Sequence, residues 1–346
     1  MTVTAPTPAP ATEVPRSSGA RLVDRVFKMR ELAILAVFLV MIAVTQLGNS
    51  EFLSEQGVKD LLLNATILVL VATGQSLVVI TRNVDLSVGS TLGVSAFAAG
   101  TWLQGGGSPV VAVSLAVLLG VGCGLVNGLL VSLGQVPALV VTLGTLYIIR
   151  GIDSIWVGSR QITAADLPGG FVDFGSGGIS AVPYLALIAL AVLVVTAYYL
   201  KHFGSGRELY ALGSNPEAAR LAGIPVRGRI LTAYVVCGGL AGLAGALYLA
   251  RFGNVDSGTG NGYELTVVSA VVVGGVVFTG GSGSVYGAAL GALLLTSVNS
   301  VLPALGVSSV WVLAINGVLL ILAIAVDRVV ALRVASALKK RNARHG

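Results

Sequence analysis

Long apolar runs without a charged residue decide what this chain can fold into. The run Leu61–Ile80 is nearly continuous Leu, Val, Ile and Ala, and several other segments reach a similar length. A helix needs about 20 such residues to cross a bilayer. Lipid offers the backbone no hydrogen bonds, so only helices and closed barrels span it, and barrel strands alternate polar and apolar residues. These runs do not alternate, and the sequence therefore predicts an all-α polytopic membrane protein.

Composition and charge agree with a membrane location. The chain is 55% hydrophobic and only 10% charged, whereas soluble domains are roughly a quarter charged. The net charge of +6 comes from Lys and Arg in the tails and in one loop beside apolar segments. That distribution is typical of membrane orientation rather than of a nucleic-acid-binding face. Cys123 and Cys237 lie in apolar segments without metal-ligand spacing, so we expect no metal site.

We predict about ten transmembrane helices. In chain order they are Glu31–Gly48, 61–81, 86–103, 109–132, 137–157, 182–200, 229–250, 264–279, 284–302 and 308–327. The third and eighth are short and rich in Gly and Ser, so either could be a half-helix or a re-entrant segment. Gly-Ser opens both the fourth and the ninth, which end near Asn127 and Asn299 and run in opposite directions. This pattern is compatible with an inverted five-plus-five repeat.

The distribution of Lys and Arg predicts the orientation. With ten spans, all but four of the 21 Lys and Arg residues fall on one side, which is then cytoplasmic. Both termini lie on that side. We predict a disordered cytoplasmic tail over residues 1–30, a transmembrane domain over 31–327 and a basic cytoplasmic tail over 328–346. The outer loop 158–182 is long and rich in glycine, and it could dock a partner or act as a flexible connector.

The cytoplasmic loop 203–228 is predicted to contain a short helix, Pro216–Ala222. Asn215 is a preferred N-cap, and Glu217 suits the positive end of the helix dipole. Gly223 allows the left-handed turn that ends the helix. A helix of two turns is not stable alone in water, so it packs either on a partner or on its own bundle. Its small apolar surface comprises Ala218, Ala219, Leu221 and Ala222.

The pattern Gly-x-Asn-x-x-Ala-Ala-x-x-x-Gly-Ile at 213–224 resembles the cytoplasmic loop of permease subunits of bacterial ABC importers, in the sugar and branched-chain amino-acid branch. The resemblance covers roughly residues 30–330. It implies that this loop holds the coupling helix, which sits in a groove of the ATPase subunit. The residues assigned to ATPase coupling in this way are Gly213, Asn215, Pro216, Glu217, Ala218, Ala219 and Gly223.

The same resemblance implies a set of partners. These are cytoplasmic ABC ATPase subunits, a second permease subunit that makes a homo- or heterodimer, and an extracytoplasmic solute-binding protein. ATP would be used by the partner subunit, and no cofactor would be bound by this chain.

A second motif, Arg82–Ser90, resembles the Ile-Asp-Leu-Ser-Val-Gly segment of sugar permeases in this branch, with Val84 in place of Ile. Arg82-Asn83 stands where Gly-Gly is common, a variant that resembles the rhamnose and autoinducer-2 importers. Asp85 beside a span is costly unless it is paired or hydrated, and Arg82 is its nearest candidate partner. The motif could serve the substrate pathway, or it could be a helix cap with an interfacial salt bridge.

Polar side chains inside the spans are the third signal. Neutral amides and hydroxyls suit the hydroxyl groups of a sugar better than charges do. The alternative is that they hold helices together. The predicted substrate-pathway residues are Gln75, Asn83, Asp85, Ser87, Asn127 and Thr142.

Some motifs are absent from the sequence. The segment Gly280–Gly283 lacks the lysine of a P-loop, and no nucleophile–base pair indicates an enzyme. The sequence therefore predicts the permease subunit of an ATP-driven importer for a monosaccharide or related small polar solute, with a rhamnose- or autoinducer-2-type solute favoured. The protein is expected in the bacterial plasma membrane. The alternative is a secondary transporter or facilitator that works without an ATPase.

Overall fold

The computed structural model describes residues 18–304 and isolated positions between 306 and 325. The predicted tenth span, 308–327, therefore lies largely outside the described residues, as do the tails 1–17 and 328–346. Helices make up about three quarters of the described chain. They are α1 Ser18–Gly48, α2 Glu55–Ile80, α3 Val88–Gln104, α4 Pro109–Ser132, α5 Ala138–Val157, α6 Gly169–Ser176, α7 Tyr184–His202, α8 Gly204–Ser214, α9 Pro216–Leu221, α10 Val226–Phe252, α11 Tyr263–Val273 and α12 Val285–Ala304.

The prediction of an all-α membrane bundle is confirmed at the level of fold class. Among the described residues, six helices are long and apolar enough to cross a membrane: α2, α4, α5, α7, α10 and α12. The third and eighth predicted spans correspond to the short helices α3 and α11, of 17 and 11 residues. The number ten and the inverted repeat stay predictions.

Two helices, α1 and α2, begin well before their predicted starts. α1 starts at Ser18 rather than at Glu31, so residues 18–30 are helical where a disordered tail was expected. The basic residues of residues 18–30 can be part of a helix, but they lower the hydropathy of this segment, and the apolar span was therefore predicted to start only at Glu31. α2 starts at Glu55, where the Ser54 side chain accepts a hydrogen bond from the Gly57 N–H. The charged first turns of α2 hid this start from the hydropathy pattern.

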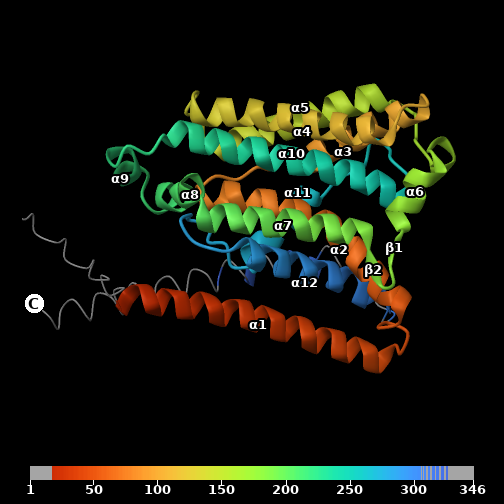
Figure 1. Cartoon of the computed structure of the whole chain (residues 1–346), viewed down its shortest axis with the longest axis horizontal. Helices are drawn as coiled ribbons and strands as arrows, with labels where there is room; N and C mark the ends of the chain where they lie inside the picture. The colour runs from red at the N-terminus through yellow and green to blue at the C-terminus, as the bar shows by residue number, and fades with distance from the viewer. Residues whose placement is uncertain are drawn as a thin grey trace, which may run out of the picture.

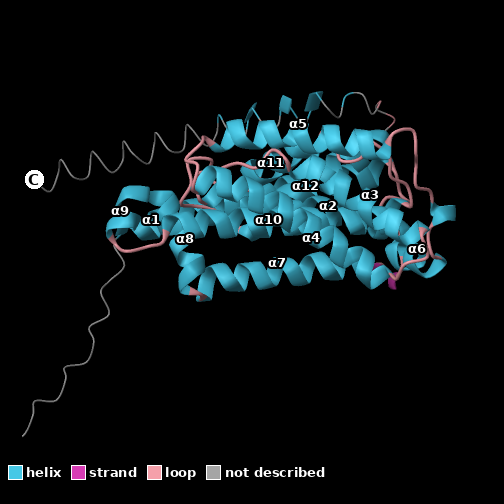
Figure 2. Cartoon of the chain, turned by 90° about the horizontal axis from the view of Figure 1, so that it is seen from above, coloured by secondary structure: helices cyan, strands magenta, loops and turns pink. Residues whose placement is uncertain are grey.

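α2 forms the centre of the bundle. In its most apolar stretch 94% of the residues are buried, against 22% in α4 and α5. α2 packs against α7, α10, α11 and α12, while α1 packs against α12. All the long helices run along the longest axis of the molecule (Figures 1 and 2). The peripheral helices therefore present their apolar side chains outward, as lipid-facing helices do.

α4 and α10 pack backbone to backbone. Gly120 and Gly124 of α4 face Gly238 and Tyr234 of α10, and a Cβ atom added at either α4 glycine would collide with a carbonyl oxygen of α10. Membrane helices associate closely through such small residues four positions apart. This contact joins the first and second halves of the chain.

The two ends of the bundle carry different structures (Figure 1). At one end lie α8 and α9. At the other lie α6 and the antiparallel strands β1 Gly178–Ile179 and β2 Val182–Pro183. The predicted outer loop 158–182 is folded rather than a simple flexible connector, because Ile162 pairs with Val255 and Gly175 packs on the Ala250 carbonyl.

The first turn of α3 meets the segment that precedes α11 inside the bundle. Gly89 of α3 and Gly260 of the loop after α10 are in such close contact that neither position has room for a Cβ atom. Arg150 of α5 donates a hydrogen bond to the Thr259 carbonyl, 2.6 Å away, in the same loop. The two short predicted spans are therefore short because each is entered through an irregular segment that is packed within protein, where such backbone is tolerated.

Candidate functional site

A buried polar network surrounds the Asp85 carboxylate, in the segment between α2 and α3. Its Oδ1 accepts hydrogen bonds from the Ser87 N–H at 2.9 Å, from the Ser87 hydroxyl at 2.7 Å and from the Asn127 amide at 3.3 Å. The Thr145 hydroxyl donates to the Asn127 Oδ1 at 2.7 Å. Asp85, Ser87 and Asn127 have essentially no exposed surface. α4 and the segment before α3 thus meet at one carboxylate, and α5 joins the network through Asn127.

Side chains also bind the irregular backbone of residues 81–87. In the orientation that satisfies both of its atoms, the Gln75 amide donates to the Asp85 carbonyl and accepts from the Asp85 N–H, each at 3.2 Å. The Tyr234 hydroxyl donates to the Val84 carbonyl at 3.1 Å, and the Thr142 hydroxyl lies 3.3 Å from the same oxygen. The Val84 and Asp85 carbonyls and the Asp85 N–H, which have no partner within a helix, thereby find hydrogen-bond partners inside the bundle.

Five of the six predicted pathway residues therefore lie together: Gln75, Asp85, Ser87, Asn127 and Thr142. Asn83 lies outside the network, because its amide donates to the backbone and hydroxyl of Thr81. The network is buried and its hydrogen-bonding groups are used within the chain. In the described structure these residues hold helices and a loop in place, which was the alternative interpretation of their sequence pattern.

The predicted partnership of Arg82 with Asp85 is wrong. The Arg82 guanidinium donates instead to two carbonyls at the end of α8, those of Gly213 and of Ser214, the latter at 2.6 Å from Nη2. Carbonyls at the C-terminus of a helix are unpaired and lie at the negative end of its dipole, so they attract a cation. Arg82 thus connects the loop of Asp85 to the residue before the Asn215 cap.

The predicted short helix is present as α9. The Asn215 side chain accepts hydrogen bonds from the N–H groups of Glu217 and Ala218, each at 3.1 Å. At the other end Gly223 has φ +79°, and the N–H groups of Gly223 and Ile224 bond back to Arg220 and Ala219. This is the Schellman arrangement that ends a helix. Both predicted caps are confirmed.

The exposed face of α9 differs from the predicted one. Ala219 is buried, whereas Ala218 is exposed and the Leu221 side chain is 91% exposed. Gly213 is also buried, and a Cβ atom there would collide with the Ile80 carbonyl at the end of α2. Among the predicted coupling residues, Ala219 and Gly213 therefore pack within the chain, and a partner would meet Ala218 and Leu221.

Further contacts join α2, α8 and the segment before α12 at this end of the bundle. The Gly281 N–H donates to the Ile80 carbonyl at 2.9 Å, and the Tyr210 hydroxyl donates to the Gly283 carbonyl at 3.1 Å. Burial raises the pKa of Tyr210 to about 12, which keeps this hydroxyl protonated as a donor. The loop that presents α9 is therefore bound to α2 and to the segment before α12.

Sequence reasoning missed three contributors to this site. Thr145 lies in the same apolar run as Thr142, but nothing in its spacing connects it to Asn127. Tyr234 lies in an apolar run and carries no motif. The role of Arg82 depends on a contact between residues 131 positions apart, and no local pattern records such a contact.

The chain matches a known family over most of its length. A family described as branched-chain amino acid transport system / permease component matches residues 57–324. No solved structure shows a significant match to the chain.

Curated relatives are similar across nearly the whole chain. The autoinducer 2 import system permease protein LsrC of Salmonella typhi is 38% identical over 293 residues, which cover 84% of this chain and 82% of the relative. The ribose import permease protein RbsC of Escherichia coli K12 is 34% identical over 315 residues, which cover 90% of this chain and 97% of the relative.

Proposed function

Because the chain belongs to the branched-chain amino acid transport system / permease component family, in its sugar ABC permease branch, we propose that it is the membrane subunit of an ATP-driven importer for a monosaccharide or a related small polar solute. The single structural observation that supports this proposal is α9. A six-residue helix with caps at both ends projects from one end of the bundle and exposes Leu221. A cytoplasmic ATPase subunit is the partner whose groove would bury that side chain.

The partners and the solute follow from the same proposal. Two ATPase subunits would supply energy, a second permease subunit would complete the pore, and an extracytoplasmic binding protein would deliver the solute. The relatives carry ribose and autoinducer 2 in their names, and the Arg82-Asn83 variant favours a rhamnose- or autoinducer-2-type solute. The chain itself would bind no cofactor, since ATP would be used by its partner.

The topology is part of the proposal. The protein is a multi-pass inner-membrane protein, and we place both termini and α9 in the cytoplasm with ten spans between the termini. The distribution of Lys and Arg supports this orientation. Residues 158–182 and the strand pair would then face the outside, where a binding protein docks.

The proposal is tested by substitutions on α9. Leu221→Glu puts a charge where the partner would bury an apolar side chain, and we expect it to stop co-purification of the ATPase subunit and to abolish uptake. The change leaves the spans untouched because Leu221 makes little contact with its own chain. Ala219→Glu is unsuitable, since Ala219 is buried and its substitution would disturb the loop itself.

The matched control is Ile179→Glu, which charges a similarly exposed apolar residue at the opposite end of the molecule. This variant should keep the ATPase subunit bound. If the ATPase subunit co-purifies equally with Leu221→Glu and with the unchanged chain, α9 is not its docking site. If no ATPase subunit co-purifies even with the unchanged chain, a transporter that works without an ATPase is the better description.

A further inference from the structure

A polar cavity of about 330 Å³ lies between α2, α10, α11 and α12, away from the Asp85 network. Its lining comprises Asn64, Leu68, Phe252, Asn261, Gly262, Tyr263, Thr266, Thr296, Asn299 and Ser300. Phe252 ends α10, a helix of 27 residues that begins near α9, so the cavity is about 40 Å from α9. On the proposed topology it belongs to the extracytoplasmic half. Its volume lies within the usual range of small-molecule sites.

Three side-chain amides of this cavity are free to bind. Asn64, Asn261 and Asn299 make no side-chain hydrogen bond within the part of the chain that the structure describes. Each amide offers two donors and an acceptor. The amides of Gln75 and Asn127, by contrast, are engaged in the buried network. The hydroxyl groups of Thr266, Thr296 and Ser300 add further acceptors to the lining.

Aromatic rings form another part of the lining. Phe252 and Tyr263 both contact Tyr248, with ring centroids 4.5 Å and 6.3 Å from it. A sugar ring carries hydroxyl groups at its edge and C–H groups on its faces, so neutral amides and aromatic surfaces together match it. The lining has no charged side chain. A zwitterionic amino acid would lose its hydration there without gaining a charged partner.

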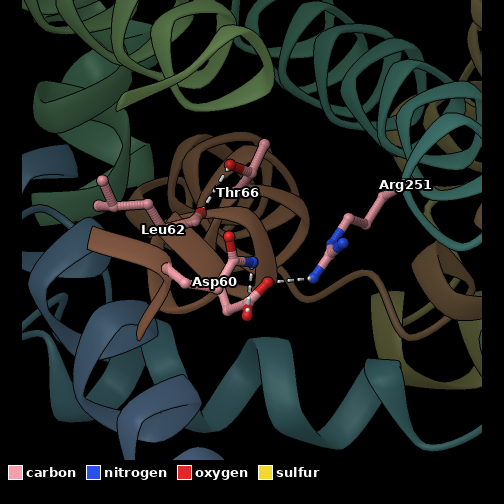
Figure 3. A network of polar contacts seen from close by, with 5 residues as sticks. Asp60, Leu62, Thr66 and Arg251 are labelled. Carbon is pink, nitrogen blue, oxygen red and sulfur yellow. Dashed lines mark hydrogen bonds and ion pairs between the residues drawn. The ribbon is translucent and has the colours of Figure 1, made fainter. Parts of the chain in front are cut away.

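An ion pair lies next to the cavity. Figure 3 shows Arg251 of α10 reaching to Asp60 of α2, where Nη2 is 3.0 Å from the carboxylate Oδ1. Gln56 binds the other carboxylate oxygen at 3.0 Å. The Arg251 Nε–H is buried and has no hydrogen-bond partner among the described residues. The pair joins α2 to α10 one turn from Asn64 and one residue from Phe252, and its guanidinium retains an unused donor.

We propose that this cavity binds an uncharged polyhydroxy solute of monosaccharide size, with Asn64, Asn261 and Asn299 as its hydrogen-bonding residues. The inference rests on the proposed function, because a solute must be carried for the site to serve transport. It moves substrate recognition from the Asp85 network to the opposite half of the bundle. The cavity also favours a sugar over the amino acids in the family's description.

Uptake by the complete transporter in cells tests the inference, with radiolabelled D-ribose and L-rhamnose as probes and L-leucine as the amino-acid comparison. Asn64→Leu and Asn299→Leu remove the amides at nearly constant volume. We expect each to lower kcat/KM for sugar uptake about tenfold or more, because polar groups of the solute lose their partner. The control is Asn254→Leu, which removes an exposed amide outside the cavity that accepts an exposed hydrogen bond from Gln161 at 2.8 Å, and uptake should change little. Unchanged uptake in both cavity variants would overturn the inference.

Thiol labelling decides the question independently of uptake. Asn64→Cys and Asn299→Cys should react with a membrane-impermeant maleimide added from outside, above the background of the unchanged chain, and D-ribose or L-rhamnose should slow the reaction where L-leucine does not. Absence of labelling, or labelling that neither sugar slows, would overturn the site. If the unchanged transporter carries neither sugar but a sugar still protects the thiol, the proposed function fails for these solutes while the site stands.

Discussion

At the scale of single residues, the Asp85 carboxylate illustrates how one oxygen atom can organise a membrane-embedded segment. Oδ1 accepts from the Ser87 backbone, the Ser87 hydroxyl and the Asn127 amide, which also lies 3.5 Å from Oδ2. An asparagine could place its carbonyl oxygen at the same point, whereas an apolar residue leaves the Ser87 N–H and hydroxyl buried without this acceptor. The Asn127 amide would keep its hydrogen bond to the Ser87 hydroxyl oxygen, at 2.8 Å. Each unpaired buried group costs about 1–3 kcal/mol.

We therefore expect Asp85→Leu to lower the Tm of the purified full-length chain clearly, and Asp85→Asn to lower it much less. Thermal unfolding in detergent measures both. Equal Tm values for the two variants would show that this oxygen does not hold the segment.

The side chains of Arg82 and Asp85 do not contact each other. The losses in Tm from Asp85→Ala and from Arg82→Ala should therefore add in the double variant.

Arg82 belongs to a different interaction, the link between α8 and the loop of Asp85. We expect Arg82→Ala to leave membrane insertion and ATPase co-purification intact while uptake falls about tenfold. The reason is that the two carbonyls before the Asn215 cap lose the cation that connects them to the transmembrane network. Uptake and ATP hydrolysis, measured on the same complex, check this.

The control for this prediction is Arg229→Ala, which breaks the ion pair of Arg229 with Glu208, whose side chains are 25% and 30% exposed. Partly exposed pairs contribute little, so uptake should change little. A parallel loss of ATP hydrolysis and uptake in Arg82→Ala would mean that the residue supports assembly rather than transmission.

At the scale of elements, the contact of α4 with α10 depends on glycines that are not equivalent. A Cβ atom at Gly124 would collide with the Tyr234 carbonyl, whereas one at Gly122, on the same helix, would meet nothing within 4 Å. We expect Gly124→Ala to destabilise the protein by about 1–3 kcal/mol, because backbone must move. Gly122→Ala should be neutral or stabilising, since alanine favours the helix. Tm measurements compare the pair, and equal values would contradict the packing argument.

The elements also show what the sequence could predict. Apolar length and capping residues located the helices, and α4 has the predicted bounds 109–132. α9 was found because Asn215, Pro216 and Gly223 each have a local role. The early starts of α1 and α2 were missed because charged turns extend an apolar helix without changing its hydropathy signal.

At the scale of the whole molecule, the two ends of the bundle must face opposite sides of the membrane. We expect a reporter active only in the cytoplasm to be silent when fused at Gly169, in α6, and active when fused at Gly346. The folded segment that contains α6 lies at the end opposite α9, and Lys and Arg gather on the α9 side. Activity at Gly169 would contradict the topology.

The candidate site could be predicted only in part at this scale. Sequence patterns selected Gln75, Asp85, Ser87, Asn127 and Thr142, and the fold brings these five together. Their hydrogen bonds within the chain could not be foreseen, because each depends on contacts between different helices. The cavity lined by Asn64, Asn261 and Asn299 was not predicted as a site for the same reason.

The central position of α2 has a consequence for how the protein is made. α2 leaves the ribosome near the beginning of synthesis, whereas α10, α11 and α12, which cover it, follow after residue 225. Until then α2 lacks its partner on the side of Gly74, which packs against the backbone of Cys237 in α10. A chain truncated before α10 would leave this side of α2 without the helix that covers it. We expect membrane quality control to recognise such incomplete chains and degrade them, so that only full-length protein accumulates.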